Sequence, residues 1–261
     1  MRGWALPLAL LALVSSATQV VVHAHPPALP IVPVQPPPVE RSVLARRLES
    51  MQADWPRHVD CASAKCVALT FDDGPGKHTG RLLDLLNERH VRATFFVVGE
   101  MVAAGGRRAV QRIAADGHEL GNHSWSHQAL SELTRKELHR ELRHTGRLVR
   151  RLTGVRMRVM RPPYGLTDRH VAAEARRAGM AQILWNLDTF DWRDRTPEVV
   201  VRRAGRATPG SIILMHDIHR TTVKAVPALL DALARKGFTF VTVSELYGDR
   251  SPAPGRKYMR R

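Results

Sequence analysis

The chain has 261 residues, and its 44% hydrophobic content supports a sizeable buried core and excludes wholesale disorder. Its 40 Lys and Arg outnumber its 24 Asp and Glu, giving a net charge of +16, which indicates an anionic partner such as nucleic acid, anionic lipid or an acidic cell-wall polymer. The only cysteines are Cys61 and Cys66, which excludes a disulfide-rich scaffold and a zinc site built on several thiolates. The 13 histidines leave open a metal site of imidazoles and carboxylates.

Residues 1–24 have the pattern of a signal peptide. Arg2 precedes an apolar run, Ala5 to Val14, that is too short to span a bilayer, and Val22 to Ala24 offers a cleavage site. An uncleaved anchor is the alternative, because residues 19–22 prolong the apolar stretch. We therefore expect a secreted or cell-wall-associated protein with no stable membrane insertion after cleavage.

Residues 25–60 are predicted to form a spacer. Seven prolines fall within residues 25–40, which favours extended polyproline conformation, and Ser42 to Met51 is predicted to be a short helix. Export to an oxidising compartment predicts a local disulfide between Cys61 and Cys66, with two unpaired thiols as the alternative.

Residues 61–248 are predicted to be a catalytic domain in which short apolar strands alternate with amphipathic helices. The expected strands are Val67–Phe71, Ala93–Val98, Glu119–Asn122, Met157–Arg161, Gln182–Asn186, Ile212–Met215 and Thr239–Val243. The expected helices are Arg81–Arg89, Arg107–Asp116, Arg135–Leu152, Asp168–Ala178, Pro197–Ala207 and Val226–Lys236. About seven such units imply an α/β fold with parallel strands, as a barrel or a doubly wound sheet. The basic segment 249–261 is expected to be a solvated tail, with an electrostatic tether as the alternative.

Unusual polar groups follow several of these strands, on the face where α/β folds gather their active sites. Asp72 and Asp73 leave the first strand; strand alternation points them in different directions, although Asp-Asp-Gly-Pro is also strong turn chemistry. His123 and His127 are four residues apart, a spacing that places both imidazoles on one side of a helical turn and is used to chelate zinc. With a third ligand from an aspartate they would form a metal site; two ordinary polar histidines are the alternative.

Three further strand ends carry candidate residues. Arg161 precedes two prolines and could orient a carboxylate, although a surface arginine before a turn fits equally well. Tyr164 could offer its backbone N–H to an oxyanion. Asp191 and Trp192 supply a carboxylate and a sugar-stacking ring, with a core tryptophan as the alternative. His216 ends an apolar strand, which favours a catalytic acid at this face over a buried core histidine.

These stretches resemble the ordered motifs of the polysaccharide deacetylase family, carbohydrate esterase family 4. They match in order and spacing over roughly Cys66 to Tyr247, through the segments 70–74, 123–127, 161–164, 188–192 and 214–216. The resemblance implies a distorted (β/α) barrel of about seven parallel strands with its active site at their C-terminal ends. It also implies a divalent metal, zinc first and cobalt second, and hydrolysis of acetyl groups on sugars.

The resemblance also implies a role for each matching residue. Asp73, His123 and His127 would be metal ligands, Asp72 the general base and His216 the general acid. Arg161 would orient Asp72, and Asp191 would pair with His216. The Tyr164 N–H would bind the oxyanion, and Trp192 and Leu214 would form the walls of the pocket. It gives Asp188 no clear role.

The expected function is deacetylation of peptidoglycan N-acetylglucosamine or N-acetylmuramic acid. Chitooligosaccharide and acetylated xylan are alternative substrates, and a non-catalytic wall-binding module is an alternative function. The expected partner is an acetylated glycan within an anionic wall polymer, and the expected state is a monomer. Nucleic-acid binding is suggested by charge alone and opposed by the signal peptide, the absence of a nucleic-acid-binding motif and an aromatic content of 5%.

Overall fold

The computed structural model describes residues 59–261, so the predicted signal peptide, proline-rich spacer and helix Ser42 to Met51 lie outside the described residues. None of the helices described there has the length and apolarity needed to cross a membrane. Cys61 and Cys66 form the expected disulfide, which joins the segment before the first strand to that strand's first residue.

The described chain forms one curled sheet whose ladders between strands are all parallel. Its strands are β1 (Cys66–Asp72), β2 (Thr94–Val97), β3 (Glu119–Asn122), β4 (Val159–Met160), β5 (Ala181–Ile183), β6 (Leu187–Asp188), β7 (Ser211–His216), β8 (Thr239–Val241) and β9 (Lys257–Tyr258). The order along the sheet is β6-β7-β1-β2-β3-β4-β5-β9, and β8 pairs with the start of β1. This arrangement confirms the predicted distorted barrel. Strands β1 and β7 are longer than expected, β3 has the expected bounds, and β2, β4, β5 and β8 are shorter.

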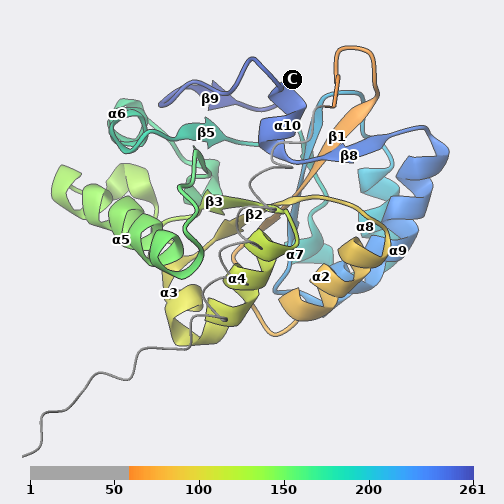
Figure 1. Cartoon of the computed structure of the whole chain (residues 1–261), viewed down its shortest axis with the longest axis horizontal. Helices are drawn as coiled ribbons and strands as arrows, with labels where there is room; N and C mark the ends of the chain where they lie inside the picture. Colours follow the sequence, from red (N-terminus) through yellow and green to blue (C-terminus); the bar gives the residue numbers. More distant parts are fainter. Residues whose placement is uncertain (1–58) are drawn as a thin grey trace, which may run out of the picture. The chain divides into compact units, whose positions relative to one another are not determined.

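Helices flank this sheet (Figure 1). They are α2 (Thr79–Glu88), α3 (Gly99–Met101), α4 (Arg107–Ala115), α5 (Arg135–Thr153), α6 (Arg169–Ala178), α7 (Asp191–Asp194), α8 (Pro197–Ala204), α9 (Arg220–Arg235) and α10 (Val243–Tyr247). Short helical turns cover Val102–Gly106, Leu130–Glu132 and Pro163–Gly165. The predicted capping box, Thr134 with Glu137, begins α5, and Gly154 ends it in the left-handed conformation.

Strand alternation separates two apolar regions. In β1, Val67, Leu69 and Phe71 belong to the larger cluster that includes the buried faces of α2, α4, α5 and α9. Ala68 points to the opposite face, where it joins a second cluster with Phe96 and Ile212. Because side chains alternate along a strand, Thr70 and Asp72 share this inner face with Ala68. The polar end of β1 therefore opens into the inside of the barrel.

The helix beginning at Arg220 differs most from the sequence prediction. It begins six residues before the expected Val226, and Pro227 lies inside it. A proline removes one backbone hydrogen bond from a helix. The helix continues through Pro227 because its buried face, formed by residues such as Val223, Val226 and Leu230, packs into the larger apolar cluster.

The C-terminal segment is part of the barrel, so the prediction of a solvated tail is wrong. Strand β5 pairs with β4, but the next strand along the chain, β6, pairs with β7. The other edge of β5 is therefore left without a partner from this part of the chain. Strand β9 pairs with that edge in parallel, and Arg260 forms an antiparallel bridge to Ser211 at the start of β7. The Tyr247 hydroxyl donates to the Arg260 carbonyl at 2.7 Å. The tail thus satisfies backbone groups that an open sheet edge would leave unpaired.

Candidate active site

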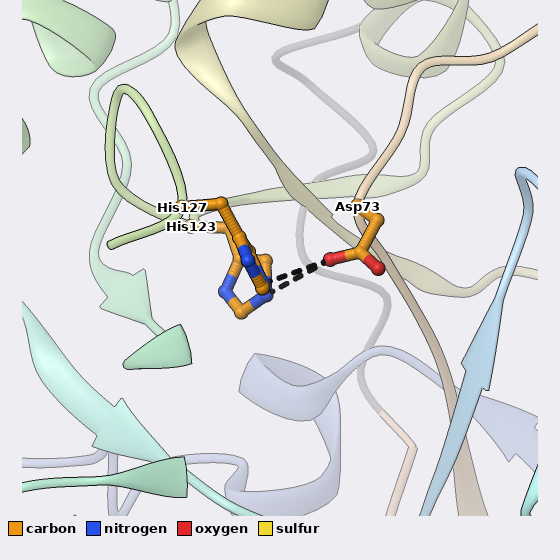
Figure 2. A group of neighbouring side chains, drawn as sticks. All are labelled: Asp73, His123 and His127. Carbon is orange, nitrogen blue, oxygen red and sulfur yellow. Dashed lines mark ion pairs between the residues drawn. The ribbon is translucent and has the colours of Figure 1, made fainter. Parts of the chain in front are cut away.

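Three side chains from two strand ends meet at a single point. Oδ1 of Asp73, which follows β1, lies 3.4 Å from Nε2 of His123 and 3.1 Å from Nε2 of His127, both of which follow β3. Figure 2 shows both imidazoles directed at this carboxylate from the opposite side. The three potential ligand atoms all lie within 4.8 Å of one another, which is the spacing of a candidate metal site.

The chemistry of this cluster fits a divalent metal. Oδ1 of Asp73 is buried and has no hydrogen-bond partner among the described residues. His123 Nδ1 lies 2.7 Å from the Arg161 carbonyl, so it carries the proton and leaves the lone pair of Nε2 facing Asp73. One carboxylate and two imidazoles suit zinc or cobalt and leave coordination positions open for water and substrate.

The two histidines are brought together by a loop, which corrects the prediction of a helical turn. Ser124 and His127 both have left-handed backbone, with φ of 66° and 58°. Non-glycine residues adopt this conformation at a cost and only where the surroundings enforce it. Here the His127 N–H donates to Ser124 Oγ at 3.0 Å, and the Ser124 N–H donates to Asn122 Oδ1 at 2.9 Å.

A glutamate on α5, which was not among the residues predicted from the sequence, anchors the same loop. The buried Glu141 accepts hydrogen bonds from the backbone N–H groups of Trp125 and Ser126 at 2.8 and 2.9 Å and from the Ser126 hydroxyl at 2.9 Å. Its neighbour Thr145 donates to the Ser124 carbonyl at 2.8 Å. The available signal was an acidic residue on the face that α5 shares with Leu138 and Leu142.

Asp72 lies beside the cluster of Asp73, His123 and His127 and forms a buried ion pair. Its Oδ1 accepts from Arg161 Nη1 at 2.8 Å, and its Oδ2 lies 3.7 Å from His123 Nε2. Arg161 is fully buried, and its other donors bind Thr70 Oγ1 at 2.8 Å and two carbonyls at the end of β5, those of Ile183 and Leu184, at 2.9 and 3.0 Å. A guanidinium fixed by this many bonds holds Asp72 in one orientation.

The turn that carries Asp73 rests on a second buried carboxylate. Asp73 has a left-handed φ of 71°, and a Cβ at Gly74 would lie 2.3 Å from Oδ1 of Asp217, so only glycine fits there. Asp217 accepts a short hydrogen bond from Thr79, and burial raises its pKa to about 7. This contact explains why Gly74 follows the two aspartates.

His216, at the end of β7, is paired with Asp191 as expected. Its Nδ1 lies 2.8 Å from Asp191 Oδ1, and its backbone N–H donates to Asp191 Oδ2 at 2.8 Å. Thr222 in the first turn of α9 also donates to Asp191 Oδ2, at 2.6 Å. Burial lowers the pKa of His216, but Asp191 outweighs it and raises that pKa to about 9. Nε2 of His216 lies 4.0 Å from Asp73 Oδ2, so a protonated imidazole faces the cluster.

The residues expected to bind substrate lie on the same strand ends and loops as this centre. Tyr164 is 65% exposed, its ring lies 4.8 Å from that of His127, and its backbone is left-handed with a φ of 61°. Trp192 is 45% exposed. Leu214 is buried and, by alternation in β7, shares its face with His216. Asp188 accepts from the Phe190 N–H at 2.6 Å, so it shapes the loop that carries Asp191 and Trp192.

Comparison with known proteins identifies the family. Residues 60–183 match the model of the polysaccharide deacetylase family. The peptidoglycan-N-acetylglucosamine deacetylase PgdA of Listeria monocytogenes is 40% identical over 71% of this chain and 40% of its own. The peptidoglycan-N-acetylmuramic acid deacetylase PdaC of Bacillus subtilis is 38% identical over 70% of this chain and 38% of its own. The chain therefore spans about two fifths of each relative.

A solved structure covers the match more fully. The structure of the T48 deacetylase with substrate superposes with a TM-score of 0.74 at 42% identity, covering 77% of this chain and 99% of that one. The chain belongs to the polysaccharide deacetylase family, which confirms the family and the fold expected from the sequence motifs.

Proposed function

We propose that this protein is a metal-dependent hydrolase that removes N-acetyl groups from amino sugars of peptidoglycan, releasing acetate and a free amine. The observation that carries the proposal is the meeting of three ligand-type side chains with a buried carboxylate and a protonated imidazole. Asp72 and His216 both lie within 4.0 Å of the cluster of Asp73, His123 and His127.

Asp73, His123 and His127 would hold the metal, with zinc proposed first and cobalt second. A bound divalent ion of this kind would lower the pKa of a coordinated water to about 7 and would polarise the acetyl carbonyl. Asp72, held by Arg161, is placed to accept the proton of the attacking water. The Tyr164 N–H is proposed to stabilise the oxyanion, a contribution worth about 3–4 kcal/mol for one such donor in other hydrolases.

His216 is proposed to protonate the departing amine. An amine leaves poorly unless it is protonated, and Asp191 keeps the imidazole charged and oriented toward the cluster. The required states are opposite, a deprotonated Asp72 and a protonated His216, so the pH profile of kcat should be bell-shaped.

The family relatives support the choice of substrate. PgdA is named for peptidoglycan N-acetylglucosamine and PdaC for peptidoglycan N-acetylmuramic acid. The net charge of +16 suits an anionic wall polymer. We propose that the protein is exported by residues 1–24 and acts as a monomer at the cell wall, with Trp192, Leu214 and Tyr164 lining the substrate pocket.

The test is acetate release by the purified chain from peptidoglycan, chitin oligomers and acetylxylan, each with zinc, cobalt or a chelator. We expect release from peptidoglycan that stops with chelator and returns when metal is restored. Release that persists in chelator would contradict metal dependence. Tight glycan binding without any acetate would instead indicate a non-catalytic wall-binding module.

A further inference from the structure

One arginine beside the proposed general acid is held in place although the mechanism above does not use it. Arg195 follows α7 with a left-handed φ of 50°. Its Nε donates to the Trp192 carbonyl at 2.8 Å, and its Nη1 lies 2.9 Å from Nδ1 of His219. An exposed arginine normally samples many rotamers, so two contacts and a strained backbone mark a constrained position.

The contact with Arg195 determines which nitrogen of His219 carries a proton. A guanidinium can only donate, so Nδ1 of His219 must accept and Nε2 must carry the hydrogen. Burial and the neighbouring Arg195 both lower the pKa of His219, which favours this neutral form. The ring of His219 lies 5.8 Å from that of His216. The pair therefore presents guanidinium and imidazole N–H donors next to the proposed acid.

Two further cations lie on the segments next to this pair. Arg220 follows His219 directly, and the side chain of Ile218 touches the loop at Gly76, which precedes Lys77. Within residues 59–261, no carboxylate forms an ion pair with Lys77, Arg195 or Arg220.

Two other carboxylates near this rim already have partners. Asp194 binds Arg193 and Arg203. Asp191 binds His216 and Thr222. Arg195 thus differs from Arg193 and Arg203 in having no carboxylate partner among the described residues.

We infer that Arg195 and His219 form a subsite for a carboxylate of the glycan substrate, beside the sugar whose acetyl group is removed. A guanidinium matches the geometry of a carboxylate, and a second N–H from imidazole adds direction. This inference rests on the proposed function, because it assigns the substrate of the same site. The carboxylate could belong to a lactyl ether on the sugar ring or to an attached peptide.

The test compares four substrates that differ in this charge. They are neutral N-acetylglucosamine oligomers, peptide-free oligomers that carry lactyl carboxylates, the same oligomers as methyl esters, and oligomers that retain their peptides. We expect the wild-type protein to prefer one of the two carboxylate-bearing glycans about tenfold or more over its uncharged counterparts, through KM, since a charge-assisted hydrogen bond is about twice as strong as a neutral one. Which of the two is preferred identifies the source of the carboxylate.

The variant series separates charge from structure. Arg195→Gln should lose the preference, and Arg195→Lys should restore part of it. Arg193→Gln is the matched control: it removes an equal charge two residues away, but one already neutralised by Asp194, which retains Arg203. It should keep the wild-type preference.

Two results would overturn the subsite. One is wild-type protein that hydrolyses charged and uncharged glycans equally well. The other is an Arg195→Gln variant that slows all four substrates in the same proportion. If no substrate releases acetate, the proposed function fails, and calorimetry then tests the subsite separately. Binding of the preferred carboxylate glycan should weaken about tenfold in Arg195→Gln, and unchanged binding would contradict the subsite.

Discussion

Asp72 and Asp73 are adjacent in the chain, yet they lie in different surroundings. Asp72 continues the alternation of β1 and points inward to a fully buried arginine. Asp73 leaves the strand with a left-handed backbone and points to two imidazoles. Two carboxylates can take opposite roles in a mechanism when their surroundings differ in this way. The two side chains therefore point in different directions, as strand alternation predicts.

The pairing of His216 with Asp191 leads to a prediction about pH. Replacing Asp191 by Asn removes the largest contribution that raises the His216 pKa to about 9. The imidazole then loses its proton at lower pH, so the alkaline limb of the kcat profile should move to lower pH, and kcat should fall by about 10²-fold or more. Steady-state kinetics across pH measures this shift.

The control for this prediction is Asp194→Asn. Asp194 belongs to the same short helix but pairs with Arg193 and Arg203 instead of His216. It should leave the alkaline limb in place. An unshifted limb in Asp191→Asn would show that this ion pair does not set the protonation of the acid.

At the scale of elements, α5 anchors the loop of residues 123–127, which carries two of the proposed metal ligands. Its buried Glu141 binds three donors of residues 125–126. Glu141→Ala should weaken metal affinity about 10- to 100-fold, because groups that orient metal ligands typically contribute this much. Titration with zinc against a competing chelator measures the change.

A residue one turn away on the same helix provides the control. Glu137 completes the capping box with Thr134, which is its hydrogen-bond partner, whereas Glu141 binds residues 125–126. Glu137→Ala should cost about 1 kcal/mol of stability or less while leaving zinc affinity unchanged. Equal zinc affinity in Glu141→Ala and wild type would contradict the proposed anchoring of the loop.

The C-terminal strand gives a second prediction at this scale. Deleting residues 249–261 removes β9 and its pairing with β5, together with the bond from Tyr247 to Arg260. Each net hydrogen bond contributes about 0.5–1.5 kcal/mol. Thermal unfolding should therefore show a Tm lower by about 5 °C or more, since 1 kcal/mol corresponds to about 2–4 °C in a domain of this size.

A triple variant in which Arg250, Arg256 and Lys257 become Gln tests whether the charges of the tail, and not its backbone pairing, stabilise the fold. It keeps the backbone of β9 and removes three of the five positive charges of residues 249–261, so its Tm should stay close to that of the wild type. A truncated chain that unfolds at the wild-type temperature would show that the tail adds nothing to the fold.

For the whole molecule, the fold class and the face that carries the site were easier to predict than the short strands and the C-terminal segment. Apolar strands ending in polar residues indicated a parallel α/β fold and the face of its site, because buried parallel strands leave a strong pattern. The choice of a barrel over a doubly wound sheet came from the resemblance to the deacetylase family. The two-residue strands β6 and β9 leave no such pattern, since their pairing depends on the gap between β5 and β7. The C-terminal charges suggested a solvated tail because composition does not record backbone pairing.

In the site, too, some residues could be predicted from the sequence and others could not. The candidate ligands and the pairing of His216 with Asp191 followed from motifs that lie far apart in the chain. Glu141 and Arg195 did not, because their importance arises from contacts with backbone atoms of other segments. The four-residue spacing of His123 and His127 also left the backbone open, and a loop with two left-handed residues replaces the expected helical turn.

Asp73, His123 and His127 are proposed to bind a single divalent ion at the C-terminal ends of the strands. Anomalous diffraction at the zinc absorption edge, from crystals of the protein grown with zinc, tests this binding. We expect one strong peak about 2.0–2.2 Å from Nε2 of both histidines and from a carboxylate oxygen of Asp73. A site without a peak, or a peak coordinated by other residues, would contradict it.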